Sequence, residues 1–86
     1  MHTVELLEAA TALAHQLGFK IREEWLDGAS GGSCEIRGQK WLFLDPDASS
    51  ADQLDTVIEA LRLDPAIHQA QVPWELQRLL DVRKSA

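Results

Sequence analysis

The feature that most constrains the fold is a short apolar hairpin near the middle of the chain. Two apolar segments flank Gly38 and Gln39, which suit a two-residue type II′ turn because glycine adopts the positive φ of its first central position. This turn predicts a strand register: Arg37 opposite Lys40, Ile36 opposite Trp41, and Cys34 opposite Phe43. Because side chains alternate across a strand, we expect the last two pairs to share one face.

The second strand of this hairpin is apolar on both faces. Its sequence Trp41-Leu42-Phe43-Leu44 lacks the polar alternation that a strand with one wet face shows. The face that holds Leu42 and Leu44, together with Leu26, therefore requires a cover. We expect the C-terminal helix to supply it, because Trp74 is bulky and has no other predicted position. A second subunit is the alternative cover.

Helical and extended periodicities define the rest of the chain. Apolar side chains recur at helical spacing over 3–17 and after Ser50, and Pro73 opens a last helix that runs to Val82. Alternation over 19–26 predicts a strand. The order α-β-β-β-α-α indicates an α+β fold of two layers, in which a three-stranded antiparallel meander packs against helices.

Length and charge limit the function classes. The chain of 86 residues suffices for a single domain, 1–86, with one core. Fourteen acidic residues against eight basic ones give a formal charge of −6, which repels phosphate backbones, so we expect no nucleic-acid partner. A single cysteine and an acidic, amphipathic N-terminus favour a cytoplasmic protein. No apolar run is long enough to span a membrane.

Cys34 is the only thiol and therefore the first candidate for nucleophilic chemistry. It follows Gly31-Gly32-Ser33, as a nucleophile on a flexible loop would. The predicted register instead places it beside Ile36 and Phe43, where cysteine behaves as a small apolar side chain. No histidine is predicted near it, so we expect a buried and non-catalytic sulfur.

The other polar residues show no pattern specific to a metal or a cofactor. His2, His15 and His68 lack the spacing typical of zinc ligands. The segment Gly28–Gly32 leads into a strand, whereas a phosphate cradle leads into a helix N-terminus. The many carboxylates are interpreted as solvated surface groups. No catalytic residue, cofactor or metal site is predicted.

Between Leu13 and Leu63 the chain combines a helix, L-G-F-K-I at 17–21, a Ser30-Gly31 loop, the hairpin and a serine-capped helix. This layout resembles the front half of the ImmA/IrrE-type zinc metallopeptidase domain. In that family the last of these helices carries H-E-x-x-H, and the matching residues here are Glu59-Ala60-Leu61-Arg62-Leu63. The resemblance therefore implies a similar layout, and neither zinc nor peptidase activity.

A second likeness rests on the spacing G-G-x-C-x-x-x-G-x-x-x-x-F-L-D. It is matched by these residues: Gly31, Gly32, Cys34, Gly38, Phe43, Leu44 and Asp45. In this motif the chain is similar to short uncharacterised bacterial proteins, and the likeness implies no activity.

These observations predict a non-enzymatic module that binds another protein or a second copy of itself. The candidate interaction residues are Trp25, Leu42, Leu44 and Trp74. Two alternatives stay open. One is a small hydrolase that uses Cys34 or carboxylates near 28–32. The other is a ligand-binding protein with 27–33 as a lid over its site.

Overall fold

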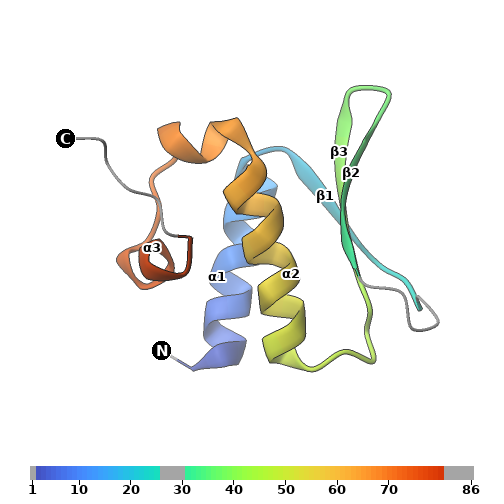
Figure 1. Ribbon diagram of the computed structural model, residues 1–86, viewed down its shortest axis with the longest axis horizontal. Helices are drawn as coiled ribbons and strands as arrows, with labels where there is room; N and C mark the ends of the chain where they lie inside the picture. The colour runs from blue at the N-terminus through green and yellow to red at the C-terminus, as the bar shows by residue number, and fades with distance from the viewer. Residues whose placement is uncertain (1, 26–30, 81–86) are drawn as a thin grey trace.

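The computed structural model describes residues 2–25 and 31–80. Its elements follow in chain order: α1 (Thr3–Gln16), β1 (Phe19–Glu23), β2 (Gly32–Ile36), β3 (Gln39–Leu44), α2 (Ser50–Leu63), the 3-10 helix η1 (Pro65–Gln69) and α3 (Trp74–Leu80). The helices lie to one side of a three-stranded sheet (Figure 1). The prediction of an α+β fold is confirmed, and η1 is an element that the predicted order lacks.

The sheet is mixed, so the prediction of an antiparallel meander is wrong. The strand order is β1-β3-β2, with β1 parallel to β3 and β2 antiparallel to it. A meander would place β2 in the centre. The central position instead belongs to β3, the strand that is apolar on both faces. In the centre of a sheet the side chains on both faces are shielded by those of two neighbouring strands, which suits an apolar strand. The more polar β1 and β2 form the edges.

The hairpin turn lies one residue earlier than predicted. Arg37 and Gly38 both have positive φ, at 52° and 80°, which is the signature of a type I′ turn. As a result Cys34 lies opposite Trp41, two residues from its predicted partner. A shift of two residues preserves the alternation of side chains, so the predicted sharing of one face by Cys34, Ile36, Trp41 and Phe43 survives.

That shared face points away from the helices, which corrects the predicted burial of Cys34. Leu42 and Leu44 are 0% and 5% exposed on the helix side, whereas Cys34 is exposed on the other side. The neighbouring strand decides the orientation. The register pairs Lys20 with Trp41 and Arg22 with Phe43, and these charged side chains need water.

Leu42 and Leu44 are covered by α1 and α2, and not by the C-terminal helix. Helix α1 packs on β1, and α2 packs on β2 and β3. Helix α3 contacts α1 and α2 on the side away from the sheet (Figure 1). Within the described ranges α3 makes no contact with a strand, so the cover that we expected from it is wrong.

The core joins the sheet to all three α-helices. Its members are the buried apolar residues Ala10, Leu13, Ala14, Phe19, Leu42, Leu44, Leu54, Val57, Ile58, Ala60, Leu61, Ile67, Leu76 and Leu80. The hydroxyl of Ser49 caps α2 by accepting a hydrogen bond from the Asp52 N–H at 3.1 Å. None of the helices in the described ranges is long and apolar enough to cross a membrane.

The first prediction concerns the close approach of chain segments at Gly31. A Cβ there would lie 2.5 Å from the Phe43 carbonyl oxygen and 3.3 Å from Thr56 Cγ2. We expect Gly31→Ala to lower the free energy of unfolding by about 1–3 kcal/mol, measured by urea denaturation. Gly32→Ala is the matched control, because a Cβ there meets nothing within 4 Å. Equal effects of the two substitutions would contradict the packing described here.

Candidate functional site

An open groove lies between β2 and α2, and it is the candidate site. It consists of two adjoining hollows that share Ser33 and Ala60. The larger, of about 390 Å³, is lined by Phe19, Ser33, Cys34, Glu35, Lys40, Ala60, Leu63, Asp64 and Pro65. The smaller, of about 240 Å³, is lined by Gly31, Gly32, Ser33, Asp55, Thr56, Glu59 and Ala60. We refer to the two together as the β2–α2 groove.

The groove exists because the facing residues are too small or too polar to fill the space. Ser33 and Glu35 lie opposite Leu42 and Lys40, so they point to the helix side of the sheet, yet both are exposed. On α2 the residues that line both hollows include Ala60, whose side chain is a single methyl group. Apolar side chains at these positions of β2 would have closed the interface, as they do on β3.

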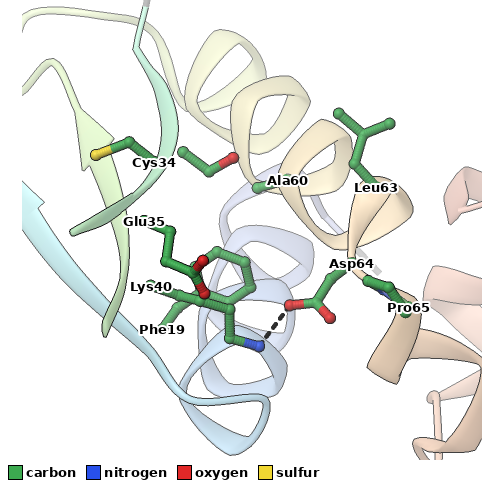
Figure 2. Close-up of a pocket in the computed structure, with 9 residues that line it drawn as sticks. Phe19, Cys34, Glu35, Lys40, Ala60, Leu63, Asp64 and Pro65 are labelled. Carbon is green, nitrogen blue, oxygen red and sulfur yellow. Dashed lines mark hydrogen bonds and ion pairs between the residues drawn. The ribbon is translucent and has the colours of Figure 1, made fainter. Parts of the chain in front are cut away.

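An ion pair forms one wall of the larger hollow and ties the hairpin to the end of α2. Lys40 Nζ donates to Asp64 Oδ2 at 2.5 Å and lies 4.7 Å from the centre of the Phe19 ring. Asp64 also accepts a hydrogen bond from the Ala66 N–H at 2.9 Å, which caps η1. Figure 2 shows Glu35, Lys40 and Asp64 gathered at this wall. One carboxylate therefore connects β3, α2 and η1.

The electrostatics of Asp64 make it a poor proton acceptor near neutral pH. Burial by itself raises the pKa of Asp64, but the hydrogen bonds from Lys40 and the Ala66 N–H, and the charge of Lys40, outweigh it and leave the pKa lowered. A general base works best with a pKa near the operating pH. The buried carboxylate of this groove thus has a structural role.

Cys34 borders the groove but directs its sulfur away from it. Figure 2 shows the Cys34 side chain pointing away from Lys40 and Asp64. No histidine lines either described hollow of the groove. The described residues also contain no group of three histidine, cysteine or carboxylate side chains that could hold a metal ion. A thiol reagent should label Cys34 readily because it is exposed, so fast labelling alone is no sign of catalysis.

The opposite side of the sheet, which we call the outer sheet face, is partly apolar. The rings of Trp41 and Phe43 stack with centroids 6.2 Å apart and an interplanar angle of 11°. Lys20 Nζ lies 5.6 Å from the centre of the Trp41 ring, a distance typical of a cation–π contact. Ile36 is 51% exposed at the free edge of this face.

The predicted interaction residues do not form one surface. Leu42 and Leu44 belong to the core and are unavailable to a partner, so their assignment as contact residues is wrong. Trp25 and Trp74 are 70% and 69% exposed, but one follows β1 and the other begins α3, which does not contact the sheet. Most of the predicted lid, 27–33, lies outside the described residues.

The sequence reasoning considered Cys34, Gly31 and Gly32 but missed the other residues of the groove. Ser33, Asp55, Glu59 and Ala60 come together only because β2 is an edge strand beside α2. One signal was available for the orientation of the sheet. Lys20 and Arg22 share one face of β1 and are both charged, which indicates that this face of the sheet must meet water.

Comparison of the chain with models of known protein families, with curated proteins and with solved structures finds no match. The two resemblances drawn from the sequence therefore stay predictions, and the site has to be interpreted from its own geometry.

The second prediction concerns the pH dependence of the Lys40–Asp64 pair. Because folding lowers the pKa of Asp64, its stabilising effect is complete above the unfolded value of about 4 and is lost as the pH falls through the folded value. We expect Asp64→Asn to lower the free energy of unfolding by about 1–3 kcal/mol at neutral pH. The difference in free energy of unfolding between the native chain and Asp64→Asn should shrink as the pH is lowered below about 4.

Urea denaturation of both proteins across this pH range measures the effect. Asp55→Asn is the control, because it removes an exposed carboxylate from the same helix and should cost less than about 0.5 kcal/mol. A constant difference between native chain and Asp64→Asn at all pH values would contradict the assignment.

Proposed function

We propose that the chain is a non-enzymatic module that binds another protein through the edge strand β2. The observation that carries this proposal is the exposure of four consecutive residues of that strand, 33–36, beside an open groove. An unpaired strand edge is a template for a further strand. Many recognition domains bind extended peptides in this way, with main-chain hydrogen bonds for affinity and side-chain hollows for specificity.

The strand register indicates which main-chain groups of β2 have no hydrogen-bond partner among the described residues. In a hairpin with a two-residue turn, the pair next to the turn, Ile36 and Gln39, exchanges both hydrogen bonds, and so does every second pair after it. The N–H and C=O groups of Ser33 and Glu35 therefore point away from β3. An extended segment running beside β2 would find two donors and two acceptors there.

The other edge of the sheet is less suited to strand addition. Strand β1 carries Lys20, Arg22 and Glu23, and charged residues on an edge strand are a common protection against further pairing. Strand β2 has a single charged residue, Glu35, and two small ones, Gly32 and Ser33. The contrast favours β2 as the docking edge.

The alternative of a small hydrolase has weaker support in the geometry. Cys34 points away from the groove, and the Asp64 carboxylate is paired with Lys40. A single exposed thiol fits a reducing compartment, so we place the proposed module in the cytoplasm.

The third prediction tests binding at the edge. Selection of random linear peptides on the folded chain should yield ligands of micromolar affinity. Ser33→Pro removes one outward N–H and leaves the hydrogen bonds to β3 intact, so it should weaken these ligands by at least about tenfold. Ser33→Ala, which keeps the N–H and removes only the hydroxyl from the groove lining, is the matched control and should weaken these ligands by less than about threefold.

Amide hydrogen exchange of the native chain gives the same answer without a variant, should Ser33→Pro fail to fold. Bound ligand should slow exchange at Ser33 and Glu35. Failure to select any ligand would contradict the proposed function, and so would ligands that leave exchange at both amides unchanged.

A further inference from the structure

The two sides of β2 differ in chemistry, which limits the segments that can join it. A strand added to this edge would continue the sheet, and its side chains would alternate between the helix side and the outer sheet face. Every second side chain of the added strand would enter the β2–α2 groove. The side chains between them would lie beside Cys34 and Ile36.

The groove side is acidic. Glu35 projects into it from β2, and Asp55 and Glu59 border it from α2. Among the described lining residues the only cation is Lys40, which is already paired with Asp64. Glu59 has a loose, exposed contact of 3.8 Å with Arg62, which lies outside the lining, whereas Glu35 and Asp55 have no ion-pair partner among the described residues. Basic side chains of a docked segment would therefore find net negative charge in the groove.

An exposed apolar residue at the end of α2 adds to this fit. Leu63 lines the larger hollow and is 69% exposed. The aliphatic stem of a lysine or arginine can pack on such a surface while its charged end stays in water. The groove thus suits long basic side chains better than short ones.

The outer side is apolar where an added strand would reach it. Ile36 is half exposed at the edge, and Trp41 lies opposite Cys34 on the neighbouring strand β3. The cations of this face, Lys20 and Arg22, belong to β1 at the far edge of the sheet. Apolar side chains of a docked strand would extend the existing apolar surface.

Charge argues against a second copy of the chain as the occupant. Two β2 strands paired about a twofold axis would bring Glu35 of each copy towards the acidic groove of the other. Each copy also carries a formal charge of −6. A basic partner avoids both sources of repulsion.

We propose that β2 binds an extended segment of a partner protein in which basic and apolar residues alternate. The basic side chains enter the β2–α2 groove beside Glu35, Asp55 and Glu59, and the apolar ones lie on the outer sheet face beside Ile36. This inference rests on the proposed function and specifies its ligand.

Three synthetic peptides of about seven residues test the pattern. One alternates lysine and valine, the second has the same residues in two blocks, and the third alternates glutamate and valine. We expect the alternating basic peptide to bind at least about tenfold more tightly than the other two. The block peptide controls for simple attraction to an acidic protein, since it has the same charge.

Variants of the chain locate the binding site. Glu59→Lys reverses a charge in the groove and should weaken the alternating basic peptide by about tenfold. Glu8→Lys makes the same change on the exposed side of α1, outside the groove, and should weaken it by less than about threefold.

The single thiol provides a readout that needs no variant. Cys34 lies on the docking strand and is the only cysteine, so its alkylation by iodoacetamide reports on this edge alone. The bound peptide should slow the alkylation at least severalfold, in proportion to occupancy.

Several outcomes would overturn the inference. Equal binding of the block peptide would mean that charge alone attracts the ligand, and tighter binding of the glutamate peptide would reverse the chemistry. Unchanged alkylation of Cys34 in the complex would place the ligand elsewhere. Protection of Cys34 on dimerisation without peptide would make a second copy the occupant. If no probe binds while random selection does yield edge-binding ligands, this inference fails and the proposed function stands.

Discussion

Burial of Leu42 and Leu44 beneath α1 and α2 is the interaction on which the remaining structure depends. Each leucine that leaves water contributes about 2–3 kcal/mol, a large share for a domain of this size. Because both faces of β3 are apolar, this strand takes the centre of the sheet and is flanked on each side. The edge positions are thereby left to β1 and β2. The exposed strand that carries the proposed function is thus a consequence of how the core is filled.

Local patterns in the sequence predicted the elements well and their arrangement less well. The helix that begins after Ser49 and the hairpin around Gly38 both follow from short-range rules and are present. The strand order could not be deduced in this way, because the parallel pairing of β1 with β3 joins segments about 20 residues apart. The turn was placed one residue too late, since Arg37 adopts a positive φ that arginine rarely takes.

The candidate site was beyond sequence reasoning for a related reason. Its surface is made by residues that are unremarkable one at a time, such as Ser33 and Ala60. They matter because each leaves space where a larger side chain would have sealed β2 against α2. The contact between Lys40 and Asp64 spans 24 positions of the chain and has no local signature. An absence of bulk at two facing positions is visible only once the fold brings them together.

The Lys40–Asp64 pair has a bearing on recognition as well as on folding. It connects the hairpin to the junction between α2 and η1, and it also lines one end of the β2–α2 groove. The spacing between the two walls is consequently set at that end by a single charged contact. The shape of the groove and the stability of the fold therefore depend on the same ion pair. A substitution that weakens it alters the surface that an incoming strand would meet, even where the chain still folds.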